Sequence, residues 1–299
     1  MGSPCHLTVY AKTELLGASA CDLVTREVER IEARYSRYRP KSLLSRLNRE
    51  AHDPMGFEAD EELLGLIEYA RTCFIESDGL FDITSGILRK GWQFGPDGRL
   101  PSPDTIESLL PAIGFEKIHQ EGSRIRFTHP GMEIDLGGIA KEYAADCAAR
   151  LLENAGIVHA VVNFGGDIRI IGPQPNGVPW EIGIHHPRKK DTLMATLELT
   201  EGAVTTSGDY ERALVIDGKH YSHLLNPKTG WPVEGLQSVS VVAPLALIAG
   251  SASTIAMLKG HEGKAWLKDM ELPCLWVDDE GKIDQSGIAA TQGLTGVSL

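Results

Sequence analysis

Four short segments contain more glycine, hydroxyl and ionisable residues than a hydrophobic core requires. They are GLFDIT at 79–84, DLGGIAKE at 135–142, TTSGDY at 205–210 and HYSHLLNPKTG at 220–230. Each has an ordinary structural explanation, such as a capping Asp, turn glycines before a helix or a helix N-cap. Together they favour a phosphate site, because glycines at a helix start let backbone N–H groups approach an anion.

Individual side chains in these segments could bind phosphate or move a proton. Lys141 lies in the first turn of the expected helix and could reach a pyrophosphate as a point charge. Thr205, Thr206 and Ser207 offer hydroxyl donors beside another glycine. His223 could act as a base near neutral pH, although a lone histidine is more often a hydrogen-bonded core residue. The sequence contains neither GxGxxG nor GxxxxGK(S/T), which excludes the Rossmann fingerprint and the P-loop.

The charge of the chain limits its partners. There are 29 Lys and Arg against 41 Asp and Glu, a formal net charge of −12. Nucleic-acid and membrane-surface binders usually carry basic faces, so neither class is expected. The basic run at 188–190 is predicted to be a solvated loop. An anionic ligand would therefore need a local cation, such as a metal ion, a helix N-terminus or a placed lysine.

Cysteine usage and hydropathy favour a protein with reduced thiols and no membrane span. The odd number of widely spaced cysteines predicts reduced, buried thiols rather than disulfides. No basic and apolar leader opens the chain, so we expect no signal peptide in it. The uncharged stretch 241–258 contains Pro, Gly, Ser and Thr, and a buried strand followed by a buried helix fits it best. The cysteines are Cys5, Cys21, Cys73, Cys147 and Cys274.

Hydrophobic periodicity predicts many helices and many strands. Helices are expected at 20–31, 42–47, 60–72, 140–155 and 249–258. Strands are expected at 6–11, 124–128, 132–136, 158–163, 167–171, 180–184, 193–199, 214–217 and 238–242, with a final hairpin of 275–277 and 281–284. Residues 95–105 are expected to form a loop, and a His-Pro-Gly turn should join 124–128 to 132–136. Since these elements do not alternate as βαβ units, the predicted fold class is α+β with antiparallel sheets.

Seven segments resemble, in order, the ApbE family of FAD:protein FMN transferases. They are MGSP at 1–4, SRYRPKSLLSRLN at 36–48, GLFDIT at 79–84, DLGGIAKEYAAD at 135–146, VNFGGDI at 162–168, TTSGDYER at 205–212 and SHLLNPKTGWPV at 222–233. The resemblance implies a T-fold-related, two-lobed fold, with residues 1–299 as one unit and FAD in a cleft between interleaved lobes. It also implies Mg²⁺-dependent cleavage of FAD, attachment of FMN to a Ser or Thr of a partner flavoprotein, and release of AMP.

The resemblance also implies roles for individual residues. His223 would be the catalytic base, and Leu224 would supply a backbone contact. The flavin and adenosine pockets would be lined by Met1, Tyr38, Leu80, Phe81 and Asp82. The ribityl and pyrophosphate groups would lie along Gly137, Gly138, Lys141 and Glu142. The cleft would be completed by Thr205, Ser207, Gly208 and Asp209.

The metal site implied by the resemblance is incomplete in this sequence. The family pairs a backbone carbonyl, here Ala140, with an Asp and a Thr four residues apart, and the Thr is Thr254. The Asp position is Gly250, so both remaining ligands are neutral, whereas Mg²⁺ normally takes a carboxylate. Glu142 stands where the family has Gly, and Asn226 where it has Asp.

Several outcomes follow from the missing acid. In the first, the metal binds weakly, held by the FAD phosphates with water or with another carboxylate such as Asp135 or Asp167. In the second, FMN is transferred at a changed or metal-independent site, and in the third the protein binds flavin without transferring it. FAD pyrophosphatase activity is a further alternative. Unpaired cysteines favour the cytoplasm, and the periplasm is the alternative if a leader has been removed.

Overall fold

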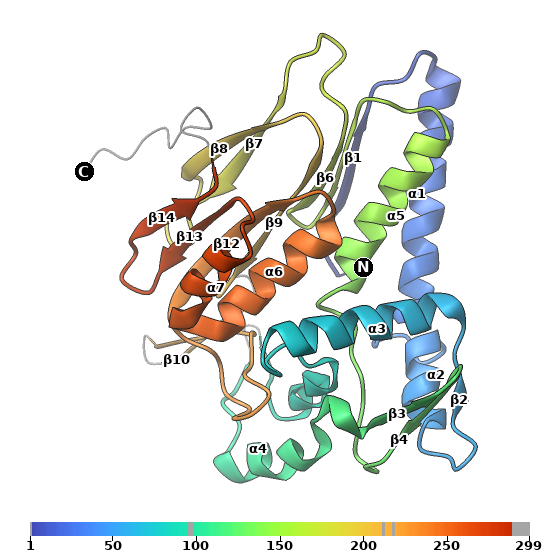
Figure 1. Ribbon diagram of the computed structural model, residues 1–299, viewed down its shortest axis with the longest axis vertical. Coiled ribbons are helices and arrows are strands. Elements are labelled where there is room, and N and C mark those ends of the chain that lie inside the picture. Colours follow the sequence, from blue (N-terminus) through green and yellow to red (C-terminus); the bar gives the residue numbers. More distant parts are fainter. Residues whose placement is uncertain (1, 95–97, 211–212, 217–218, 289–299) are drawn as a thin grey trace.

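A seven-stranded antiparallel sheet forms the centre of the fold (Figure 1). The structure is a computed structural model that describes residues 2–94, 98–210, 213–216 and 219–288. Across the sheet the strands are β1 (Cys5–Val9), β5 (Ala160–Phe164), β6 (Asp167–Ile171), β9 (Gly202–Gly208), β12 (Leu236–Ala243), β13 (Cys274–Asp278) and β14 (Ile283–Ser286). Every neighbouring pair is antiparallel.

Helices cover one face of this sheet and a β-hairpin covers the other. Helix α6 (Ala246–Lys259) packs on β9 and β12, α5 (Ala140–Asn154) packs on β5 and β6, and α1 (Glu14–Tyr35) and α7 (Gly263–Asp269) pack on α5 and α6 respectively (Figure 1). The hairpin consists of β7 (Trp180–His185) and β8 (Leu193–Leu199). Side chains along β13 point alternately to the two faces of the sheet, so Leu275 packs with the hairpin and Trp276 packs with the helices.

A second lobe occupies the lower half of Figure 1. It contains α2 (Leu43–Glu50), α3 (Glu61–Glu76), the 3₁₀ helix η1 (Ile83–Lys90) and α4 (Pro103–Leu109). A small antiparallel sheet has the order β2–β4–β3, from Phe57–Glu58, Arg124–Phe127 and Ile118–Glu121. Two short 3₁₀ helices, η2 (Leu110–Ala112) and η3 (Phe115–Lys117), follow α4. Elsewhere in the chain are η4 (Gly260–Glu262), between α6 and α7, and the antiparallel pair β10 (Leu214–Ile216) and β11 (Lys219–Tyr221).

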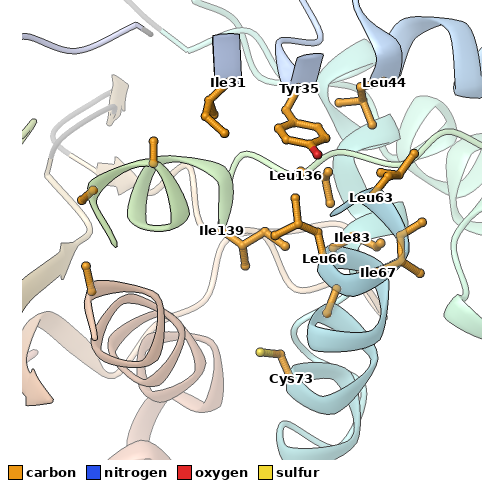
Figure 2. Close-up of a cluster of buried hydrophobic side chains, with 14 of the residues drawn as sticks. Ile31, Tyr35, Leu44, Leu63, Leu66, Ile67, Cys73, Ile83, Leu136 and Ile139 are labelled. Atoms are coloured by element: carbon orange, nitrogen blue, oxygen red, sulfur yellow. The ribbon is translucent and has the colours of Figure 1, made fainter. Parts of the chain in front are cut away.

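The main hydrophobic core runs through both lobes and fixes the segment that leads into α5. Figure 2 shows Ile31 and Tyr35 of α1 above side chains of α3, with Leu136 and Ile139 between them. Leu136 and Ile139 have no solvent exposure. The DLGGIAKE segment is therefore anchored by apolar residues on both sides of its glycines.

Local sequence signals place several elements correctly. Ser42 caps α2 by accepting a hydrogen bond from the Ser45 N–H, and Asp60 caps α3 by accepting from the Leu63 N–H. The predicted strands 167–171 and 193–199 match β6 and β8, and the final hairpin is present. The stretch 241–258 divides into the end of β12 and most of α6, as expected. In the described residues, no helix is both long and apolar enough to cross a membrane.

The predicted strand at 132–136 is wrong. Its apolar residues do alternate, and Met132, Ile134 and Leu136 are almost fully buried, but the segment crosses the core as an extended chain without a strand partner. The Asn48 side chain takes the place of a partner: its amide donates to the Ile134 carbonyl and its oxygen accepts from the Ile134 N–H, both at 2.9 Å. Strand β4 pairs instead with β2 and β3.

Two other expectations also fail. The end of the predicted loop 95–105 includes the start of α4, where Ser102 is the N-cap and Pro103 occupies the first turn. The TTSGDY segment is not a helix cap, because its first four residues belong to β9. All five cysteines are free thiols, and the prediction that they are buried holds for Cys73, Cys147 and Cys274 but is wrong for Cys5 and Cys21, which are exposed.

Candidate functional site

The hydroxyl-rich residues 205–207 belong to strand β9, which is covered by helix α6. Ser207 Oγ lies 2.8 Å from Ser253 Oγ and 3.1 Å from Thr254 Oγ1 of α6. Thr206 points the other way and is hydrogen-bonded to Ser240 at 2.8 Å. Thr205 shares the face of Ser207 by strand alternation and is 1% exposed. The structure therefore brings together Ser207 and Thr254, which the sequence assigns to the FAD cleft and the metal site.

The GLFDIT and DLGGIAKE segments pack directly on each other. The Asp135 N–H donates to the Ile83 carbonyl at 2.8 Å. A Cβ on Gly138 would lie 3.2 Å from the Phe81 ring, so this glycine permits a close approach. Phe81 belongs to the main core, while Leu80 is half-buried. Phe81 therefore packs closely against the backbone of the glycine segment at Gly138.

Asp82 is used structurally within its own segment. Its Oδ1 accepts hydrogen bonds from the Thr84 N–H at 2.8 Å and the Thr84 hydroxyl at 2.7 Å, which caps η1. Burial raises the pKa of Asp82 above its usual value. The capping explanation considered for this residue is confirmed.

Lys141 lies between two buried acids at the start of α5. Its Nζ is 2.6 Å from Asp167 Oδ2 and 4.0 Å from Glu142 Oε1. Asp167, the first residue of β6, is 2% exposed, and Glu142 is 7% exposed. One ammonium group thus neighbours two carboxyl groups, and the cluster carries an excess of acid.

The side chain of Glu142, on α5, packs against the backbone of Gly250, on α6. A Cβ added to Gly250 would be only 2.5 Å from Glu142 Cγ and 3.2 Å from its Oε1. Burial raises the pKa of Glu142 well above its usual range, and the neighbouring charge of Asp167 raises it further. Glu142 Oε2 is buried and has no hydrogen-bond partner among the residues that the structure describes. The space of the missing side chain at 250 therefore holds a carboxylate from another helix.

Asp146, one turn further along α5, fixes the start of α6. Its two carboxylate oxygens accept from the N–H groups of Ala246 and Leu247, each at 2.9 Å. The α6 N-cap residue, Leu245, has no capping side chain of its own. Asp146 therefore caps α6 although it lies 100 residues earlier in the sequence. No local sequence pattern reveals this contact.

The segment containing His223 and Leu224 folds onto the GLFDIT region. The Leu224 N–H donates to Ser222 Oγ at 3.1 Å, and the half-buried His223 lies between these residues. Asn226 forms a turn by accepting from the Lys228 N–H at 2.8 Å, a bond that an Asp at this position would also make. Lys228 Nζ then donates to the Asp78 carbonyl at 2.8 Å.

A pocket of about 500 Å³ opens where these two segments meet. Of the predicted site residues, Asp82 lines it. Its wall also includes the turn 78–79, the end of α3 at Phe74 and Ile75, and Lys228.

Tyr38 lies apart from this pocket and is 73% exposed. The Arg37 guanidinium stands 5.0 Å from the centre of its ring and donates to its hydroxyl at 2.9 Å. Arg37 also forms an ion pair with Asp135, which ties Tyr38 to the DLGGIAKE segment. Sequence reasoning overlooked Arg37, although it lies in the family-like segment 36–48.

Asp209 is held by an arginine from the β7–β8 hairpin. Arg188 Nη1 and Nη2 donate to its two oxygens at 2.7 and 2.6 Å, a bidentate pair. Residues 188–190 form an exposed loop as predicted, and Arg188 makes this ion pair from it. A Cβ on Gly208 would overlap the Tyr210 ring at 2.3 Å. Met1, expected in the flavin pocket, lies outside the described residues.

Known proteins resemble this chain over most of its length. The sequence model of the ApbE family matches residues 1–276. The FAD:protein FMN transferase of Vibrio cholerae is 31% identical over 260 residues, covering 85% of this chain and 78% of that protein. The Escherichia coli K12 protein of the same name is 32% identical over 238 residues, covering 76% of this chain and 67% of its own.

Solved structures confirm the predicted fold class. The ApbE protein of Thermotoga maritima superimposes with a TM-score of 0.85 at 33% identity, over 95% of this chain and 94% of that one. The flavin transferase ApbE of Vibrio cholerae gives a TM-score of 0.83 at 29% identity, over 96% and 94%. Both likenesses cover nearly the whole chain. The chain belongs to the ApbE family.

Proposed function

We propose that this chain is an FAD:protein FMN transferase, the activity named for its Vibrio and Escherichia relatives. One observation carries the proposal beyond the family resemblance. Gly137, Gly138 and Lys141 lie at the start of α5, which packs on α6, and Ser207 of β9 is 3.1 Å from Thr254 of α6. A helix N-terminus, a lysine and hydroxyls are groups that suit a diphosphate ester.

The reaction is an in-line phosphoryl transfer. A Ser or Thr hydroxyl of the acceptor protein attacks the FMN-side phosphorus, a new O–P bond forms, and the bond to the AMP phosphate breaks with AMP leaving. Positioning and charge neutralisation supply most of the rate in such reactions. His223 is the residue that we assign to accept the hydroxyl proton.

The remaining side chains divide the work of holding FAD. Gly137 and Gly138 let the phosphates approach the first turn of α5, and Lys141 neutralises them. Ser207, Gly208 and Asp209 close the cleft from the end of β9, and Leu224 contributes backbone. The flavin and adenosine halves are assigned to Tyr38, Leu80, Phe81 and Asp82.

The residues around α5 and α6 fit a Mg²⁺ ion. Mg²⁺ prefers hard oxygen ligands with at least one carboxylate, and it is often shared with substrate phosphates. Thr254 offers a hydroxyl, Ala140 a carbonyl, and Glu142 a buried carboxylate oxygen without a hydrogen-bond partner. Bound there, Mg²⁺ would neutralise charge on the phosphates as AMP leaves.

A transfer assay tests the function. Purified protein is incubated with FAD, MgCl₂ and a candidate acceptor domain, and the acceptor is examined for covalent flavin fluorescence after denaturing electrophoresis. Label on the acceptor, AMP in solution, and loss of label when the acceptor Ser or Thr becomes Ala are expected. Free FMN with AMP would identify a pyrophosphatase instead, and tight FAD binding without AMP would identify a flavin-binding protein.

A further inference from the structure

The buried pair Glu142 and Gly250 indicates how this chain completes its cation site. We propose that Glu142 of α5 is the acidic ligand of the divalent cation, acting from the space that a side chain at position 250 of α6 would occupy. The proposal rests on the proposed function for the identity of the cation as Mg²⁺. The cation binding itself can be measured without any transfer reaction.

Sterics link the two residues. Gly250 lies inside α6, a 14-residue helix, where glycine is normally unfavourable. Any Cβ at this position would lie 2.5 Å from Glu142 Cγ, too close for real atoms, so Glu142 keeps its position only while residue 250 is glycine. The two departures from the family pattern, Gly at 250 and Glu at 142, are therefore coupled. Together they exchange the positions of the acid and the glycine, so that the acid is on α5 instead of α6.

The Glu142 carboxylate has the right surroundings for a cation. Thr254 lies one helical turn from Gly250 on the same face of α6, and Ser207 Oγ is 3.1 Å from its hydroxyl. Thr254 and Ser207 are half-exposed, whereas Ser253 is buried, so the cluster opens to solvent on the Thr254 side. The carboxylate thus stands beside hydroxyl ligands that a phosphate-bearing substrate could approach.

Charge also favours a cation here. Glu142 and Asp167 contribute two carboxyl groups, and the single ammonium group of Lys141 lies within 4.0 Å of both. Asp167 Oδ2 is ion-paired with Lys141 Nζ at 2.6 Å. Glu142 Oε2 is more than nine-tenths buried and, like Asp167 Oδ2, accepts no hydrogen bond from the described residues. A buried carboxylate oxygen is costly unless it is neutralised or bonded. The competing explanation is that Glu142 stays a neutral acid with a structural role only.

Mn²⁺ titration of the full-length protein separates these explanations. Binding is followed by the electron paramagnetic resonance signal of free Mn²⁺, with and without FAD. Glu142→Gln should weaken Mn²⁺ binding by roughly tenfold or more, since even indirect metal-site partners are typically worth that much. The matched control is Glu153→Gln, the same change at an exposed position of the same helix, and it should bind as wild type does. Wild-type Mn²⁺ affinity in folded Glu142→Gln would overturn the proposal.

Moving the acid back tests the exchange itself. Glu142→Gly should lose Mn²⁺ binding, and adding Gly250→Asp should restore it to within a few fold. Gly250→Ala alone should weaken binding because its methyl group displaces Glu142 without removing any charge. A folded double variant that fails to bind Mn²⁺ would contradict the exchange. A wild-type protein that binds Mn²⁺ through Glu142 but labels no acceptor would refute the proposed function and leave this inference standing.

Discussion

Nζ of Lys141 lies 2.6 Å from Oδ2 of Asp167, so the lysine that we assign to the FAD phosphates is already oriented by a buried acid. Two strands and a helix set this geometry. The turn at Gly165 and Gly166, both with positive φ, joins β5 to β6 and places Asp167 at the start of β6 beside the first turn of α5. Lysine has four flexible methylene groups, and this partner removes much of their freedom before FAD binds.

Lys141→Met should weaken FAD binding roughly ten- to a hundredfold, the usual value of a hydrogen bond to a charged group. Flavin fluorescence quenching measures the change. The single variant also leaves Asp167 buried without its cation, so Lys141→Met combined with Asp167→Asn is the control for folding. If the folded double variant binds FAD as wild type does, Lys141 does not contact the phosphates.

His223→Ala should lower kcat about 10²- to 10⁴-fold, the usual contribution of a general base, while FAD affinity stays near wild type. The matched control is His220→Ala, an exposed histidine of β11, which should leave kcat unchanged. Single-turnover labelling of an acceptor domain measures both. A His223→Ala enzyme with wild-type kcat would exclude the assigned role.

Asp146→Ala should destabilise the protein by about 1–2 kcal/mol or more, because two N–H groups at the start of α6 lose their acceptor. Arg169, 3.4 Å from the same carboxylate, also loses its partner. Urea unfolding measures the loss. Asp146→Asn keeps one acceptor oxygen and should lose less; equal stability of Asp146→Ala and wild type would mean that α6 needs no cap from α5.

Glu62 should make stability depend on pH in the acid range. Burial raises its pKa, but hydrogen bonds from Arg30 and Tyr143 and the charge of Arg34 outweigh burial and lower the pKa from 4.5 to about 2. A lowered carboxyl pKa contributes stability above the unfolded value, and that contribution is lost as pH falls from 4.5 toward 2.

The difference in unfolding free energy between wild type and Glu62→Gln should therefore be largest near pH 6 and shrink by pH 3. Glu61→Gln, the exposed neighbour in α3, is the control and should show no such trend. A difference that stays constant between pH 6 and pH 3 would show that the Arg30 and Arg34 contacts do not perturb Glu62.

Sequence signals predict those parts of the fold that depend on neighbours along the chain. Ser42 and Asp60 cap their helices as their positions suggest, flanking Gly and Pro turns identify β6, and alternation identifies β8. The failure at 132–136 has a physical reason: alternating burial is also produced by an extended segment bonded to a side chain, here Asn48.

The candidate site depends on contacts that are distant in sequence. The ordered motifs identify the family, and this prediction is confirmed. They also name Glu142 and Gly250 as departures, but nothing in the sequence says that the two residues touch. Arg188 with Asp209, and Asp146 with the start of α6, are equally invisible until the chain is folded.

The contact between Glu142 and Gly250 constrains how such a protein can change over generations. An acid gained first at position 250 would collide with Glu142, and glycine gained first at position 142 would leave the proposed cation site without its carboxylate. Each single substitution is therefore expected to impair cation binding. The two arrangements interconvert without that loss only when both positions change together or when neighbouring side chains shift to make room. Chains with this pair should consequently persist as a lineage of their own.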